Sequence, residues 1–353
     1  VRMDVPNAST ALATGTTVTL GSADTGPTQD TVLQIAACTA TSGTVTCASP
    51  ITVSNSAPVT SKAVLDNNPA TTIVPAVSGL ITLANSRPLW IRNSGLQLWQ
   101  LNSKVTGTGD LYFDTGSFAR RARLTATTSD FVGNIYLVSG GVQVFTGSGG
   151  TNNCVPDTAN IIFTAGSILG MGTSDTVGAL SGTGTVQANL STSTNTATLT
   201  IGANNQDGVF NGTILSLLGS TGGGGIAITK TGTGTQTLNA SSTYAGGTII
   251  TGGTIAVGHD SALGSGAVNL NSVTGAIRAA DTNARTIANA ITYSTNFTLG
   301  SATTGDLLFT GAVNVGGGNK EFNVLNARTE FSGIMSGTLT PVRTKKGPGT
   351  LVF

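Results

Sequence analysis

The segment from Lys230 to Leu270 is the part of the sequence that most constrains the fold. It consists of short runs rich in Thr, Ile and Val, each closed by Gly, Gly-Gly or Asn. Apolar and polar residues alternate within the runs 248–251 (TIIT) and 254–257 (TIAV), and this period of two predicts strands with one buried face. The glycines between the runs supply the positive φ values that tight turns need. Strands this short favour a solenoid, in which each coil pairs with the next.

The same segment resembles a known family, the autotransporter-associated β-strand repeat of passenger-type bacterial surface proteins. The resemblance is carried by three pieces: 230–238 (KTGTGTQTL), 242–250 (STYAGGTII) and 251–258 (TGGTIAVG). Ser242 stands where the repeat usually has Asn, and Gln236 where it usually has Leu. The resemblance implies an all-β fold, a right-handed parallel β-helix exported to the cell exterior. It implies no activity, because such repeats are architectural elements of adhesins and enzymes alike.

Composition agrees with an extracellular structural protein. Gly accounts for 49 of 353 residues, and charged residues for only 9%, against about 25% in typical domains. The surface must therefore be covered mainly by Thr, Ser and Asn. The net charge of +1 gives no reason to expect nucleic acid as a partner. No apolar stretch reaches the roughly 18 residues of a membrane-spanning helix, and we expect no cofactor and no metal.

The two ends of the sequence also lead to predictions. The sequence begins at Val1 without a signal peptide, so we expect that the leader of an exported chain has been removed. It closes with 347–353 (GPGTLVF), which is the opening of another repeat. Either more protein follows, or this last strand completes another structure.

The sequence divides into two regions. Residues 1–100 hold most of the prolines and both tryptophans, and they lack the Gly-x-Gly motif found from residue 104 onward. We expect an N-terminal cap or irregular β region there, continuous with the solenoid, because an uncovered first coil would expose apolar core and unpaired backbone. A separate small β-domain is the alternative. Residues 101–353 are expected to form the solenoid, with an open or truncated C-terminal end.

Two cysteines flank a predicted hairpin. Cys38 and Cys47 bracket a stretch with Ser42-Gly43 at its centre, and cysteines opposite each other on a hairpin can reach disulfide geometry. An oxidising exterior favours this bond, so we predict a Cys38–Cys47 disulfide, with two separate buried thiols as the alternative.

A second recurrent motif is an aromatic residue followed two positions later by Gly. The aromatic is expected to fill the core beside a Gly corner of the coil, where rings of successive coils add to apolar burial. The five residues are Phe131, Phe145, Tyr244, Phe309 and Phe331.

Catalytic signals are weak. His259 and Asp260 are adjacent, so on an extended chain their side chains point to opposite faces and do not form the oriented pair of a catalytic triad. Acidic residues are sparse; Asp110 and Asp130 lie about one coil apart, so coil geometry could bring them together, but no pair stands out. We therefore predict that the protein is not an enzyme. A polysaccharide-processing β-helix enzyme, which needs two carboxylates along a groove, is the alternative.

Basic residues gather in two clusters, one at Arg120, Arg121 and Arg123 and one near the C-terminus. Such charges protect a sheet edge from aggregation. The functional alternative is contact with an acidic patch of a neighbouring subunit or with an anionic surface polymer.

The prediction is therefore an extracellular structural or adhesive β-solenoid, a surface stalk or a filament subunit. Its partners would be further copies of the chain in a homo-oligomer or fibre, and surface glycans. Head-to-tail association would use terminal strands, because an open edge can add a strand from another subunit. A phage tailspike-like fibre is a further alternative, although no trimerising heptads are present. The candidate residues for self-association are Arg343, Lys345, Lys346, Thr350, Leu351, Val352 and Phe353.

Overall fold

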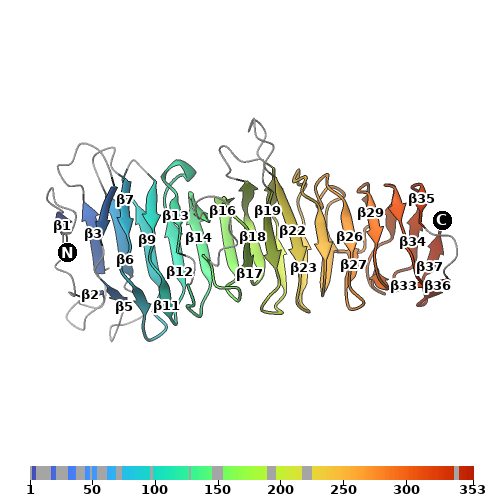
Figure 1. Cartoon of the computed structure of the whole chain (residues 1–353), viewed down its shortest axis with the longest axis horizontal. Coiled ribbons are helices and arrows are strands. Elements are labelled where there is room, and N and C mark those ends of the chain that lie inside the picture. The colour runs from blue at the N-terminus through green and yellow to red at the C-terminus, as the bar shows by residue number, and fades with distance from the viewer. Residues whose placement is uncertain are drawn as a thin grey trace. The chain divides into compact units, whose positions relative to one another are not determined.

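The secondary structure of this protein is almost entirely β. The computed structural model describes residues 2–4, 17–20, 31–36, 44–47, 50–53, 62–68, 74–95, 98–126, 129–144, 154–188, 196–216, 225–337 and 342–353. Within these ranges a single short 3₁₀ helix, η1 (Phe118–Arg120), interrupts the strands. The expected all-β class is confirmed. The chain forms two compact units, Val1–Asp175 and Thr176–Phe353, and Figure 1 labels many of their elements.

Unit 1 is built from three series of parallel strands, and successive coils add strands to these series. The first series is β1 (Arg2–Asp4), β3 (Thr31–Ala36), β6 (Ala63–Asn68), β9 (Leu89–Asn93), β12 (Leu111–Asp114), β14 (Ile135–Ser139) and β16 (Ile161–Met171). The second is β4 (Thr44–Cys47), β7 (Val74–Val77), β10 (Trp99–Leu101), β13 (Ala122–Leu124), β15 (Gly141–Val144) and the end of β16. The third is β2 (Val18–Leu20), β5 (Ile51–Val53), β8 (Ile81–Leu83) and β11 (Val105–Gly107).

Unit 2 repeats this plan. Its first series is β18 (Leu180–Ala188), β20 (Gly208–Phe210), β23 (Thr235–Leu238), β25 (Thr254–Val257), β27 (Ala276–Ala279), β30 (Phe297–Leu299), β33 (Lys320–Val324) and β36 (Arg343–Lys346), with β21 (Thr213–Leu215) beside the end of β18. A second series is β19 (Ala197–Ile201), β22 (Ile226–Lys230), β24 (Thr248–Ile250), β26 (Val268–Leu270), β29 (Ile291–Tyr293), β32 (Val313–Asn314) and β35 (Met335–Ser336). The last is β28 (Arg285–Ile287), β31 (Leu307–Phe309), β34 (Arg328–Phe331) and β37 (Thr350–Val352). Strand β17 (Asp175–Val177) spans the boundary of the two units.

This parallel stacking of coil on coil is a β-helix, as predicted, and its core runs through the inside of the coils. In unit 1 one row of inward-facing side chains consists of register partners from five successive coils. Each of the five is at most 3% exposed. Because every coil covers the apolar side chains of its neighbour, burial grows with the number of coils. The row is Leu65, Ile91, Phe113, Leu137 and Phe163.

The Gly-x-Gly motif marks corners where the backbone of one coil lies against the backbone of the coil before it. Gly107 has a φ of +93°, and a Cβ added there would lie 2.0 Å from the carbonyl oxygen of Leu83. Gly232, in the segment that resembles the known repeat, has a φ of +66° and would place a Cβ 2.0 Å from the carbonyl oxygen of Gly202. Only Gly accommodates both the left-handed backbone and the close approach.

Strands from the first hundred residues already take part in the coils. Strands β3 and β6 pair in parallel with one another, and β6 pairs in parallel with β9 and through it with later coils. Strand β4, which ends at Cys47, pairs in parallel with β7. Cys38 and the side chain of Cys47 lie outside the described residues, so the disulfide stays a prediction. In the part of the chain that the structure describes, no helix has the length and apolar character needed to cross a membrane.

Candidate functional site

A row of aromatic side chains, which we call the aromatic ladder, lies on the outer face of β9, β12 and β14. Trp90, Tyr112 and Tyr136 are register partners on these three strands. The ring centroids are 4.6 Å apart between Trp90 and Tyr112 and 4.4 Å apart between Tyr112 and Tyr136, with interplanar angles of 13° and 3°. The ammonium of Lys62 lies 3.7 Å from the centroid of the Trp90 ring. Parallel pairing in register therefore builds a continuous stack from residues more than twenty positions apart.

The ladder presents ring edges and hydroxyls to solvent. Its rings are half-buried, and because they stack on one another, the faces between them are covered. Burial, followed by the neighbouring Tyr136 and the charge of Asp110, raises the pKa of Tyr112 above its ordinary value. The phenol therefore stays protonated at neutral pH and can both donate and accept a hydrogen bond. The ladder is suited to hydrogen bonding along its edge and less suited to stacking a sugar ring between its members.

An ion pair anchors the strands beside the ladder. Asp66 on β6 is fully buried, and it accepts a hydrogen bond from Nη2 of Arg92 at 3.0 Å. The same carboxylate accepts hydrogen bonds from the amide and the hydroxyl of Ser94. These contacts satisfy the buried charge and join one coil to the next, which is a structural role.

The carboxylates that the sequence spaced one coil apart have separate structural partners. Asp110 accepts a hydrogen bond from the backbone amide of Asn134 at 2.7 Å, and Asp130 forms an ion pair with Lys104 at 2.7 Å. Their contacts bridge neighbouring coils. The two side chains are not oriented by a shared partner in the part of the chain that the structure describes.

The only histidine lies in a turn. Nδ1 of His259 accepts a hydrogen bond from the amide of Ser261 at 3.0 Å, whereas Asp260 accepts one from the amide of Thr286 on the following coil at 3.0 Å. The two neighbours thus serve different backbone groups. Among the described residues, no group of three or more His, Cys, Asp or Glu side chains could hold a metal ion.

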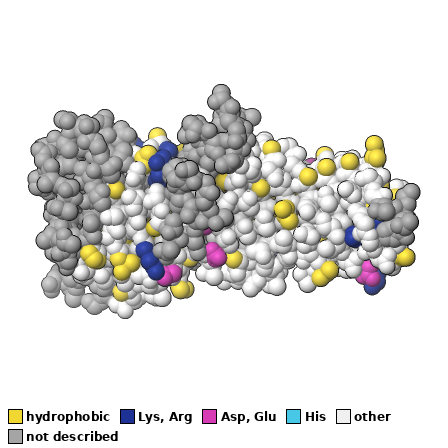
Figure 2. Space-filling model, in the orientation of Figure 1, with side chains coloured by type: hydrophobic (Ala, Val, Ile, Leu, Met, Phe, Trp, Pro, Cys, Tyr) yellow, Lys and Arg dark blue, Asp and Glu magenta, His cyan; other side chains and the backbone are white. Residues whose placement is uncertain are grey.

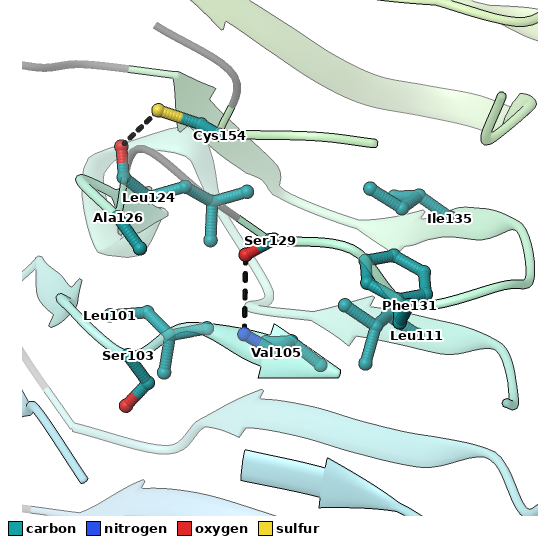
Figure 3. A pocket seen from close by; sticks show the side chains of 10 residues that line it. All are labelled: Leu101, Ser103, Val105, Leu111, Leu124, Ala126, Ser129, Phe131, Ile135 and Cys154. Carbon is teal, nitrogen blue, oxygen red and sulfur yellow. Dashed lines mark hydrogen bonds between the residues drawn. The ribbon is translucent and has the colours of Figure 1, made fainter. Parts of the chain in front are cut away.

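A small cavity lies inside the coils of unit 1 (Figure 3). The Ser129 hydroxyl accepts a hydrogen bond from the amide of Val105 at 3.2 Å, and the Cys154 thiol lies 3.6 Å from the carbonyl oxygen of Leu124. The buried Ser103 hydroxyl has no hydrogen-bond partner among the described residues. No charged side chain is among the residues that line it. It is lined by Leu101, Ser103, Val105, Leu111, Leu124, Ala126, Ser129, Phe131, Ile135 and Cys154.

The first basic cluster lies at η1 and β13. Arg121 and Arg123 both donate hydrogen bonds to the side-chain oxygen of Gln143 on β15. Charged groups are rare among the other described residues, and most of the described surface in Figure 2 is neither charged nor hydrophobic. This agrees with the low charge content of the sequence.

The second basic cluster lies on β36, the strand that pairs with β33. Lys346 forms an ion pair with Glu321 at 2.7 Å. Arg343 donates to the carbonyl oxygens of Gly318 and Gly316, and Lys345 donates to that of Gly347. Each of the three cations has a contact within its own coil or with the coil before it.

The remaining residues predicted for self-association lie on and after β37. Thr350, Leu351 and Val352 form this strand, which pairs with β34. The Phe353 side chain is 65% exposed and stacks on Phe331, with centroids 6.0 Å apart and an interplanar angle of 17°.

Four of the five aromatic residues predicted at coil corners can be placed. Phe131, Tyr244, Phe309 and Phe331 are all at most 2% exposed. Phe309 and Phe331 are register partners, and their rings stack with centroids 4.8 Å apart. Phe145 lies outside the described residues.

Sequence reasoning missed the burial of Lys230. This side chain is only 1% exposed, and its ammonium donates to the carbonyl oxygen of Thr231 at 2.5 Å. Burial lowers the pKa of Lys230 to about 8, opposed by the negative charge of Asp207. A Cβ on Gly253 would lie 2.6 Å from the ammonium, so the glycines of the corner leave room for it. The signal was the Lys that opens the motif Lys-x-Gly-x-Gly.

Comparison with known families supports the resemblance seen in the sequence. Residues 228–257 match the family model of the passenger-associated-transport-repeat. The matched segment includes β23, β24 and β25, which belong to two successive coils of unit 2. The predicted similarity to an autotransporter-passenger-type repeat protein is thereby confirmed. No curated protein and no solved structure matches the chain.

Proposed function

We propose that this chain is a structural or adhesive β-solenoid on the outside of a bacterial cell. The observation that carries the proposal is the match of residues 228–257 to a passenger-associated-transport-repeat within a stack of parallel coils. The low charge and the outward hydroxyl and amide side chains support it, because such a surface changes little with salt and pH.

Labelling of intact cells tests the location. Antibodies raised against the purified chain should label unbroken cells of the source organism, and external protease should remove the label. A cytoplasmic protein labelled by a second antibody, accessible only after lysis, is the matched control. Labelling that requires lysis for both proteins would refute the proposed location.

For an adhesive role, we propose the aromatic ladder as the contact face for surface glycans, because Tyr112 and Tyr136 present hydroxyls beside one another. The double variant Tyr112→Phe, Tyr136→Phe removes both hydroxyls and retains the stacked rings. On an array of surface glycans it should bind more weakly than the wild type. Equal binding by both proteins would exclude the ladder hydroxyls, and absence of binding by the wild type would leave a purely structural role.

We also propose that β36 and β37 pair with strands of a coil in a second copy of the chain, by strand addition. Support comes from the apolar side chains beside these strands, since Val342 is 62% exposed and Phe353 65%. Deletion of residues 344–353 should abolish oligomers in sedimentation velocity, and Phe353→Ser should weaken them. If both variants form oligomers as well as the wild type does, strand addition at this edge is contradicted.

For the chain's organisation, we propose that residues 1–100 form the N-terminal part of the solenoid and its cap. The parallel pairing of β3 with β6 and of β6 with β9 supports this. A fragment starting at residue 101 should then lose stability in its first coils, as seen by faster hydrogen exchange in β12. Unchanged exchange would favour a separate N-terminal domain.

A further inference from the structure

We propose that Arg121 and Arg123 form a binding site for a doubly charged tetrahedral oxyanion, either a sulfate or a phosphate group. The two residues flank buried Ala122 at the start of β13. Since side chains alternate along an extended chain, both guanidinium groups leave the same outer side of the sheet. This site goes beyond the proposed function, and its failure would leave the surface location untouched.

A single neutral amide holds the two cations side by side. Oε1 of Gln143 accepts a hydrogen bond from Nε of Arg121 at 2.8 Å and another from Nε of Arg123 at 3.1 Å. Gln143 is only 2% exposed and is the register partner of Arg123 on the adjacent strand. Its position is therefore fixed by the sheet. Because each Arg uses its Nε for this bond, the amide orients the two planar groups rather than neutralising them.

Arg121 is held by further contacts. Its Nη1 donates to the carbonyl oxygen of Phe118 at 3.2 Å, and its Cζ lies 4.9 Å from the centroid of the Phe118 ring. A stacked guanidinium with a fixed fork loses little conformational freedom when it binds an anion. The pair is thus organised before any ligand arrives.

Electrostatics favours an anion at this position. Burial lowers the pKa of Arg121, and the charge of Arg123 lowers it further. Both groups remain protonated at neutral pH, so the shift reflects first the burial of the Arg121 charge and then its repulsion by Arg123. The ion pairs Arg92–Asp66 and Lys104–Asp130 of unit 1 do not include Arg121. An anion bound to both guanidiniums would relieve their repulsion.

The geometry also indicates the class of ligand. Guanidinium forks match the oxygen atoms of sulfate, phosphate and their esters, with two parallel hydrogen bonds from one Arg. Two forks side by side present donors to several oxygens of one tetrahedral group, and they match the charge of about −2 of a free sulfate ion or of a phosphate monoester. The group can come from the free ion or from a surface polysaccharide that carries phosphate monoesters.

Calorimetric titration tests the site. Sodium sulfate and sodium phosphate are titrated separately into the whole chain near neutral pH, with ionic strength held constant by sodium chloride. The wild type should show saturable binding, weakened about tenfold or more in Arg121→Gln and Arg123→Gln, since each removes charge-assisted hydrogen bonds. Arg278→Gln removes an outward arginine of β27 in unit 2 and should bind like the wild type. No saturable binding, or equal binding by all four proteins, would overturn the proposal.

A second variant tests the site even if Arg121→Gln and Arg123→Gln lower the stability of the fold. Gln143→Glu places a carboxylate between the two guanidiniums, so the protein should unfold at the same or a higher temperature and should lose sulfate binding. A lower unfolding temperature, or sulfate binding equal to that of the wild type, would contradict the electrostatic argument. Retention on a polysaccharide that carries phosphate monoesters would identify a polymer as the source, and binding of the inorganic ions alone would identify the free ion.

Discussion

Substitution of Gly232 by Ala tests whether the Gly-x-Gly corners fix the distance between coils. The residue has a φ of +66°, and its added Cβ would lie 2.0 Å from the carbonyl oxygen of Gly202. An ordinary contact between carbon and oxygen is about 3.3 Å, so the two backbones must separate by about 1.3 Å. A matched control is Gly318→Ala in the same unit. Gly318 has a φ of +74°, and its Cβ would meet only the ammonium of Lys320, at 3.8 Å.

The cost of each substitution follows from the neighbouring contacts. The left-handed backbone costs about 1–2 kcal/mol for Ala in both variants. At Gly232 the separation also breaks two hydrogen bonds between coils, from the amide of Thr231 to Ile201 and from the amide of Thr233 to the side chain of Asn205. At about 1 kcal/mol each, these add about 2 kcal/mol that Gly318→Ala does not incur.

Hydrogen-exchange mass spectrometry measures this difference locally. The opening free energy of the amides in 226–238 should fall by about 3–4 kcal/mol in Gly232→Ala. Around residue 318 in the control it should fall by only about 1–2 kcal/mol. The extra 2 kcal/mol corresponds to about thirtyfold faster exchange. If Gly232→Ala accelerates exchange no more than Gly318→Ala does, the close approach is relieved without loss of coil pairing, and the reasoning from the corner geometry is wrong.

Three further predictions follow from buried or stacked side chains. The folded-state pKa of Lys230, about 8, lies below its ordinary value of 10.5, so the unfolded chain binds more protons than the folded chain between pH 8 and 10.5. The free energy of unfolding should therefore rise with pH across this window. In urea titrations, Lys230→Met should remove this rise. Tyr293→Phe should lower the free energy of unfolding of unit 2 by about 1–3 kcal/mol, because the hydroxyl contacts the carbonyl oxygens of Phe297 and Glu321; an unchanged urea midpoint would contradict this. Tyr112→Ser interrupts the aromatic ladder and should lower the free energy of unfolding by about 1–3 kcal/mol, because it removes two stacked pairs. It should also change the fluorescence of Trp90, and an unchanged spectrum would argue against stacking.

Much of the fold could be predicted from the sequence because its signals are local. Alternation in 248–251 and 254–257 predicts strands, and the structure has β24 and β25 there. The glycines of Gly-x-Gly predict turns, since a positive φ is a property of one residue. These local signals do not determine which residue of one coil pairs with which residue of the next coil. Thr235 pairs with Thr254 and Phe210 with Leu238, whereas Thr31 pairs with Ala63, so the step between coils is 19, 28 and 32 positions in these three pairs.

Because the step between coils varies, the candidate sites could be located only in the tertiary structure. The sequence by itself determined the repeat family, the β-solenoid class and the scarcity of charge, because these depend on composition, on alternation and on turn residues. Only stacking decided that Trp90, Tyr112 and Tyr136 form one ladder and that Gln143 lies between Arg121 and Arg123. It also buried Lys230 among the glycines of a corner. Side chains from different coils meet through backbone register, and register depends on loop lengths that follow no period in the sequence.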